Sequence, residues 1–126
     1  MTSQYTLLQQ LSDAFGPPND ETDVKTLLRQ ELSEFVDQIR EDALGNLFFT
    51  LDGDEKYPRV MLAAHMDEVA FLITHIEAQG FLRFHTLGGI TPHVMPGQRI
   101  RLKGRHGPVS AIIGTKPPHV MSDEDR

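Results

Sequence analysis

The hydrophobic pattern of this 126-residue chain changes its period once, and this change restricts the folds open to it. Up to residue 36, apolar side chains recur every three or four residues, as on one face of an α-helix. From residue 47 on, they occur in short runs of strand length, which Gly, Pro, Asn and Asp separate. Helices followed by strands of this kind predict an α/β layer structure.

Two helices are expected before residue 37. The first covers residues 4–15, and Gly16 suits the position after a helix end, because the prolines that follow it cannot continue the helical hydrogen-bond ladder. The second helix is expected to begin after Asn19 as its N-cap, with acidic residues close behind that favour the positive end of a helix. Its apolar stripe runs from Val24 to Val36.

Short strands are expected after the helices. The apolar run Val60–Ala64 is continuous, which predicts a strand that other elements cover on both faces. Two hairpins are expected downstream, with turns at Gln79-Gly80 and at residues 104–107. The expected strands cover residues 47–51, 60–64, 69–77, 81–86, 99–103 and 108–113. Short strands separated by turns are typical of a small β-barrel or sandwich.

The charge is unevenly distributed along the chain. Residues 1–77 contain 15 acidic and 5 basic residues, whereas residues 78–122 contain 6 basic residues and no acidic one. The last four residues have an acidic balance, and the net charge of the whole chain is −6. This break indicates two structural units with different surfaces.

Composition excludes several classes of protein. With 39% hydrophobic and 24% charged residues, the chain resembles an ordinary globular protein rather than a disordered one. It contains no cysteine, which excludes disulfides and thiolate metal sites. No apolar run approaches the ~20 residues that span a bilayer, and the first residues lack the pattern of a signal peptide. A cytoplasmic location is therefore expected, with no membrane partner.

The triplet His65-Met66-Asp67 follows directly after the predicted buried strand. In an extended backbone His65 and Asp67 point to the same side, and catalytic groups of α/β sheets collect beyond the carboxyl ends of strands. A neutral imidazole is a good ligand for zinc or cobalt, and a nearby carboxylate can hold its other ring nitrogen. The alternative is a polar strand exit in which Asp67 caps a turn. Spacing alone favours this second interpretation.

A longer resemblance changes that judgement. Residues 63–71, AAHMDEVAF, resemble the metal-binding strand end of the glutamyl and deblocking aminopeptidases, also called the cellulase M or tetrahedral aminopeptidase family. Further matches occur in the same order at Phe15-Gly16-Pro17, Leu44-Gly45-Asn46-Leu47, Gly80-Phe81-Leu82, Leu87-Gly88-Gly89 and residues 113–119. The resemblance thus extends from about residue 5 to residue 119.

The resemblance implies a catalytic chemistry. Members of the family are co-catalytic metallopeptidases that remove N-terminal residues from peptides with two divalent metals, usually zinc or cobalt. By this resemblance His65 is a metal ligand, and Asp67 is the catalytic-site aspartate that orients it. The metals supply Lewis-acid chemistry and activate water, while a glutamate acts as general base. Despite the cellulase name, no glycosidase action is implied.

The resemblance also implies an architecture. Residues 1–72 resemble the N-terminal part of an α/β catalytic domain, and residues 73–119 resemble the first part of an inserted small β-barrel. Residues 120–126 form an acidic tail. In the family the barrel mediates assembly into hollow particles of twelve subunits, so a homo-oligomer is implied for the full enzyme.

Two departures from the family pattern affect these expectations. Ala70 stands where the family usually has glycine, a change that is expected to be harmless. Family members are more than twice as long, and their other metal ligands and the general base lie beyond the equivalent of Arg126. Glu68 is not expected to replace that base, since it alternates away from His65. We therefore expect an N-terminal portion of the enzyme that is inactive alone.

The other histidines are given structural interpretations first. A two-residue loop at Gln79-Gly80 would put His75 and His85 on opposite faces of the hairpin. A three-residue loop starting at Ala78 would instead put them diagonally on one face. The remaining histidines, His93, His106 and His119, are expected in turns or in packing roles.

Two rival functions remain. Arg99, Arg101, Lys103 and Arg105 alternate with other residues, so one strand face is strongly positive. A β-barrel with such a face can bind an anionic partner such as nucleic acid, but this segment has few aromatic residues for stacking on bases. The other rival is a non-catalytic assembly or binding module. Neither rival function would act on the peptide substrate that the resemblance implies.

Overall fold

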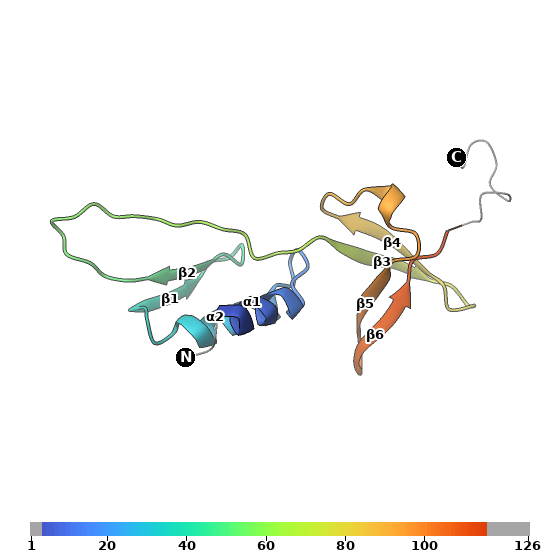
Figure 1. Cartoon of the computed structure of the whole chain (residues 1–126), viewed down its shortest axis with the longest axis horizontal. Coiled ribbons are helices and arrows are strands. Elements are labelled where there is room, and N and C mark those ends of the chain that lie inside the picture. Colours follow the sequence, from blue (N-terminus) through green and yellow to red (C-terminus); the bar gives the residue numbers. More distant parts are fainter. Residues whose placement is uncertain (1–3, 116–126) are drawn as a thin grey trace. The chain divides into compact units, whose positions relative to one another are not determined.

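The computed structural model describes residues 4–115, in which two α-helices precede three antiparallel hairpins (Figure 1). The helices are α1 (Gln4–Asp13) and α2 (Thr22–Leu32). The strands are β1 (Gln38–Glu41), β2 (Leu47–Thr50), β3 (Ala70–Ile76), β4 (Leu82–Leu87), β5 (Arg99–Gly104) and β6 (Gly107–Ile112), with a 3₁₀ turn, η1 (Pro92–Val94), before β5. The motif match at residues 116–119 and the acidic tail lie outside the described residues.

The chain divides into two compact units between Gly88 and Gly89. The first unit contains the helices and the first two hairpins, and the second contains the third hairpin. The predicted boundary near residue 72 stays a prediction. Helices and strands are both present, as an α/β fold requires, but each sheet within residues 4–115 has two strands. The closed β-barrel therefore also stays a prediction.

Helix α1 forms as predicted and ends at Asp13, two residues early. Gly16 does not adopt the left-handed conformation that glycine often takes after a helix. It is buried instead, and a Cβ atom at this position would lie 2.8 Å from Cγ2 of Val24 and 3.4 Å from the carbonyl oxygen of Met66. Glycine is therefore needed here because of a close contact, which corrects the helix-ending role predicted for it.

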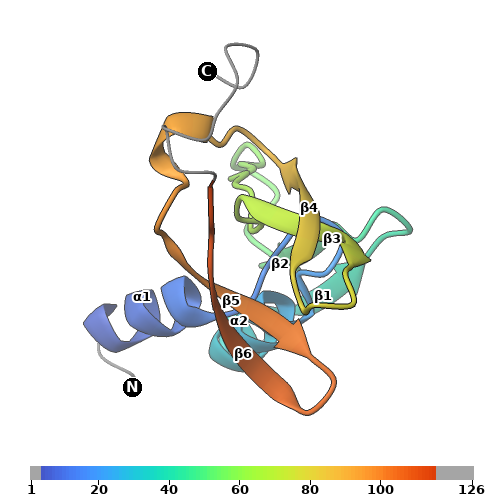
Figure 2. The same cartoon turned by 90° about the vertical axis from the view of Figure 1, so that its right-hand side faces the viewer.

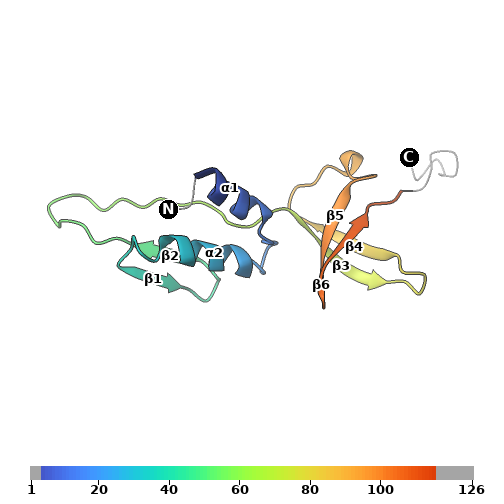
Figure 3. The same cartoon turned by 60° about the horizontal axis from the view of Figure 1, so that its bottom comes forward.

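Helix α2 begins at Thr22, with Glu21 in the N-cap position, so the prediction of Asn19 as the N-cap is wrong. Asn19 has a φ of 70° and lies in a turn, which the Asp20 amide closes by donating to the Pro17 carbonyl at 2.9 Å. Asparagine tolerates this left-handed conformation better than most residues, so the turn takes it out of the helix. Figure 3 shows α1 and α2 lying side by side.

The β1–β2 hairpin is tied to α2 by charged side chains. Glu41 of β1 accepts hydrogen bonds from Lys25 at 3.0 Å and from Arg29 at 2.8 Å. The turn of the hairpin is closed by Asp42, whose carboxylate accepts the backbone amides of Leu44 and Asn46. The sequence pattern missed β1, since three of its four residues are polar.

The predicted buried strand at residues 60–64 is not formed, which corrects that expectation. Figure 1 draws the long segment between β2 and β3 without a strand arrow. Val60, Met61 and Leu62 are 81%, 84% and 93% exposed. A strand needs neighbours that take its backbone hydrogen bonds, and among residues 4–115 none pairs with this run. An apolar run indicates that its residues tend to be buried, but it does not determine which other elements cover them.

Both later hairpins form where predicted, within two residues. In the β3–β4 hairpin the Glu77 amide donates to the Phe81 carbonyl at 2.8 Å, so the loop contains three residues and starts at Ala78. Phe71 and Phe84 pack edge to face, with ring centroids 4.7 Å apart. In the second unit, the Gly97 amide donates to the Ile113 carbonyl at 2.8 Å and the Ile113 amide donates to the Gln98 carbonyl at 3.0 Å. Figure 2 shows the β5–β6 hairpin that these bonds close.

Little hydrophobic surface is buried in either unit. Among the described residues, Val24 in the first unit and Ile113 in the second are the hydrophobic side chains with less than a tenth of their surface exposed, at 6% and 7%. No described helix is long and apolar enough to cross a membrane.

Candidate functional site

His65 and Asp67 form a pair in the segment between β2 and β3. The Nδ1 atom of His65 lies 3.0 Å from Oδ1 of Asp67 and 3.0 Å from the Asp67 backbone carbonyl oxygen. The imidazole is 85% exposed and the carboxylate 42% exposed. The contact expected from the i, i+2 spacing is therefore present, although the strand that was expected to precede it is not.

The two contacts define which ring nitrogen carries the proton. A carbonyl oxygen and a carboxylate oxygen are both acceptors, so Nδ1 of His65 must be the donor. In the neutral ring Nε2 then keeps its lone pair, and among the described residues it makes no hydrogen bond. This is the arrangement in which a carboxylate prepares a histidine to bind a metal. The donor chemistry of His65 thus fits zinc or cobalt.

Glu68 makes its hydrogen bonds to the turn between α1 and α2. Its backbone amide donates to the Gly16 carbonyl oxygen at 2.8 Å, and its Oε1 atom accepts the Gly16 amide at 3.3 Å. The predicted strand alternation of Glu68 and His65 stays a prediction, because residues 65–68 form no strand. The contact itself could not be predicted, since 52 residues separate the partners and no local spacing signals it.

The site contains one candidate ligand. Within residues 4–115, no three His, Asp or Glu side chains come together in a group that could hold a metal ion. The three-residue loop puts His75 and His85 on the same face of the β3–β4 hairpin, where His75 pairs with Arg83 and His85 with Leu72. These two histidines form no larger cluster with other described ligands. The roles predicted for His65 and Asp67 remain proposals.

Three of the four residues of the predicted basic face lie on β5, whereas Arg105 lies in the turn after it. Arg99, Arg101 and Lys103 are exposed and alternate with the half-buried Ile100 and Leu102. Three positive side chains therefore lie along one face of the hairpin, opposite the apolar face.

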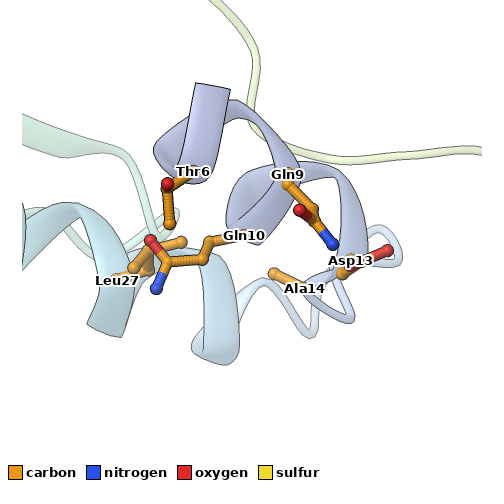
Figure 4. A pocket seen from close by; sticks show the side chains of 6 residues that line it. All are labelled: Thr6, Gln9, Gln10, Asp13, Ala14 and Leu27. Carbon is orange, nitrogen blue, oxygen red and sulfur yellow. The ribbon is translucent and has the colours of Figure 1, made fainter. Parts of the chain in front are cut away.

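A groove of about 510 Å³ lies between the helices of the first unit (Figure 4). Its lining residues are Thr6, Gln9, Gln10, Asp13 and Ala14 with Leu27 of α2. This lining contains one carboxylate and no histidine, so the groove is not a candidate for the predicted metal chemistry.

Comparison with known proteins identifies a family. Residues 45–126 match the M42 glutamyl aminopeptidase family. The chain is 40% identical over 118 residues to the glutamyl aminopeptidase of Lactococcus lactis, a match that covers 92% of this chain and 32% of the relative. The chain spans about a third of the length of the curated relatives it matches.

Two solved structures are similar to this chain over almost its whole length. The TET aminopeptidase from the marine sediment archaeon Thaumarchaeota archaeon superposes with a TM-score of 0.86 at 36% identity, covering 94% of this chain and 33% of that one. The TET1 peptidase of Pyrococcus horikoshii, which can assemble into a tetrahedron or a large octahedral shell, gives a TM-score of 0.80 at 31% identity and covers 98% of this chain and 37% of that one. Together with the family match, this likeness leads to one conclusion: the chain belongs to the M42 glutamyl aminopeptidase family.

Proposed function

We propose that this chain supplies the first metal ligand of a metal-dependent aminopeptidase, a hydrolase that removes N-terminal residues from peptides. The observation that carries the proposal is the pair of 3.0 Å contacts between His65 Nδ1 and Asp67. They hold the ring in the form whose Nε2 atom can bind a divalent cation. Two metals, zinc or cobalt, would supply Lewis-acid and water-activating chemistry when bound.

His65 and Asp67 have different roles in this proposal. His65 binds the metal through Nε2, and Asp67 fixes the ring orientation and raises the basicity of Nε2 by accepting the Nδ1 proton's hydrogen bond. Within residues 4–115, no group of three or more His, Asp or Glu side chains could hold a metal ion, so the remaining ligands and the general base must come from elsewhere. We propose that they belong to the part of the relatives that this chain does not span, so that the 126-residue chain alone is inactive.

Assembly is the second part of the proposal. The homo-oligomer is expected to be a dodecamer, and its contacts to be made by residues 73–119 as part of a β-barrel. Support comes from the tetrahedral and octahedral assemblies of the TET1 peptidase and from the short, two-stranded hairpins of this segment, which have unpaired edges.

The proposed location is the cytoplasm, and the absence of cysteine fits a cytoplasmic protein.

A second function is favoured by one specific observation, the basic face of β5. Arg99, Arg101 and Lys103 alternate on an exposed strand face that could meet the phosphates of a nucleic acid. Salt-sensitive retention of the chain on single-stranded DNA would support this alternative, and no retention even at low salt would exclude it. In that case, or in the case of a non-catalytic assembly module, replacing His65 would leave the measured binding unchanged.

The proposed function is tested by zinc and cobalt titrations of the 126-residue chain, together with an assay on short peptides with free N-termini. We expect weak metal binding that His65→Ala abolishes and His106→Ala leaves intact, because His106 lies in the exposed β5–β6 turn. We expect no turnover. Equal loss of binding in both variants would contradict a role for His65, and turnover that His65→Ala abolishes would contradict the incomplete site.

A further inference from the structure

Two hydrogen bonds connect the turn after α1 to the segment that carries His65. Gly16 and Glu68 exchange them: the Glu68 amide donates to the Gly16 carbonyl oxygen at 2.8 Å, and the Gly16 amide donates to the Glu68 carboxylate at 3.3 Å. We refer to this pair of bonds as the Gly16–Glu68 clasp. It joins residues that lie 52 positions apart in the sequence.

The Gly16 side of the clasp is fixed by packing. Gly16 is buried, and its Cα atom approaches Val24 so closely that a Cβ atom would lie 2.8 Å from a Val24 methyl group. Val24 is the most buried hydrophobic side chain described in the first unit, with 6% of its surface exposed. The clasp therefore attaches the His65 segment to the best-packed point of that unit.

The Glu68 side of the clasp lies in a segment with few other attachments. Among the described residues, positions 58–67 donate no backbone hydrogen bond. The flanking attachment points are Asp52, whose amide donates to the Asp37 carboxylate at 2.7 Å, and Ala70, where β3 begins. Without the clasp, the backbone around His65 would be held only at these two distant points.

Neighbouring residues of this segment make contacts with different partners. His65 contacts Asp67, while the Glu68 carboxylate and amide bond to Gly16. The contact with Asp67 sets the tautomer and tilt of the ring, but it does not set the direction in which the whole pair faces.

We propose that Glu68 is a positioning residue for the metal ligand His65, and that it acts through the Gly16–Glu68 clasp. The proposal rests on the proposed function for the part that concerns metal, but the clasp itself does not. Within the described part of the chain, no hydrogen bond of Glu68 goes to the imidazole or to Asp67. It holds the backbone that carries them, so that Nε2 of His65 points in one direction when further ligands are present.

The experiment compares Glu68→Ala, Glu68→Gln and Glu68→Asp in the full 126-residue chain with the control Glu55→Ala, an exposed residue of the same segment. Two quantities are measured by NMR: hydrogen exchange of the Gly16 amide, and the zinc-dependent shift of the His65 ring. Glutamine keeps the acceptor oxygen without the charge, aspartate keeps the charge without the reach, and alanine removes both.

We expect Glu68→Ala and Glu68→Asp to accelerate exchange of the Gly16 amide by about two- to tenfold, the range for one lost hydrogen bond. Zinc binding at His65 should weaken in the same two variants, while Glu68→Gln and Glu55→Ala should keep both properties. Rescue by glutamine separates positioning from charge, because a purely electrostatic role of Glu68 would be lost in glutamine and kept in aspartate. That reversed order, or unchanged exchange in Glu68→Ala and Glu68→Asp, would overturn the proposal.

A second variant approaches the clasp from its other side. Gly16→Ala forces Val24 or the turn to move, and we expect it to accelerate exchange at residue 16 and to weaken zinc binding as Glu68→Asp does. Because Gly16→Ala and Glu68→Asp break the same contact, their effects on zinc binding should be less than additive in the double variant. Additive effects would contradict the clasp. If His65 binds no zinc in the unmodified chain, the proposed function fails, while Gly16 exchange still decides whether the clasp exists.

Discussion

Lys25 and Glu41 join helix α2 to strand β1 through a hydrogen bond of 3.0 Å between Nζ and Oε1. This contact changes the pKa of both groups. The hydrogen bond from Lys25, with a second one from Arg29, lowers the pKa of Glu41 below its ordinary value. The hydrogen bond to Glu41 in turn raises the pKa of Lys25 above its ordinary value.

The first prediction concerns pH. A carboxyl group with a lowered pKa stabilises the folded state above its unfolded pKa, and this contribution is lost as pH falls through the folded value. Lysine with a raised pKa contributes below its unfolded value, and this is lost as pH rises through the folded value. We therefore expect the contact between α2 and β1 to weaken below about pH 4 and above about pH 10.5.

The measurement is amide hydrogen exchange in β1 as a function of pH, corrected for the intrinsic pH dependence of exchange. Glu41→Gln should remove the loss of protection at acid pH, whereas Glu34→Gln, in the turn after α2, should leave it unchanged. If protection in β1 has the same pH dependence in the unmodified chain and in Glu41→Gln, the ion pair does not hold the hairpin.

The second prediction concerns the packing of the first unit. Val24→Ala removes two methyl groups from a side chain that is 6% exposed, and it should destabilise this unit by about 2 kcal/mol. Val60→Ala is the matched control, because Val60 is 81% exposed and should cost less than about 0.5 kcal/mol. Urea unfolding followed by the helical circular dichroism signal measures both. Equal destabilisation would mean that Val60 is covered in solution.

Local patterns predicted the elements whose stabilising contacts are close in sequence. The helices and the last two hairpins follow from side-chain periodicity and turn residues, and even the faces of His75 and His85 followed once the loop length was known. The pair of His65 and Asp67 was predictable for the same reason, since two residues separate them.

Contacts between distant residues were not predictable in this way. The strand expected at residues 60–64 requires partners that a run of apolar residues cannot specify. The N-cap role predicted for Asn19 was wrong because Asn19 lies in a turn before the helix, which a hydrogen bond from the Asp20 amide to the Pro17 carbonyl closes. The Gly16–Glu68 clasp depends on two segments meeting, so neither segment carries a signal for it.

The third prediction is self-association of the chain. Exposed apolar residues and unpaired strand edges favour contacts between copies. Leu62, 93% exposed within an apolar run, should contribute more than Leu44, which is 89% exposed but isolated in the β1–β2 turn. Light scattering should show oligomers or aggregates that Leu62→Lys reduces and Leu44→Lys does not. A stable, well-folded monomer at high concentration would contradict this expectation.

The proton position in His65 decides most directly whether this residue can bind a metal through Nε2. Nitrogen NMR of the histidine rings at about pH 8, where a free imidazole is neutral, distinguishes a protonated Nδ1 from a protonated Nε2. We predict that His65 carries its proton on Nδ1 and that added zinc shifts the Nε2 resonance of this ring. Asp67→Ala keeps only the backbone carbonyl as acceptor, so it should increase the share of the other tautomer and weaken the zinc effect. A His65 ring protonated on Nε2, or one that zinc affects no more than His106, would contradict the assignment of this pair to a metal site.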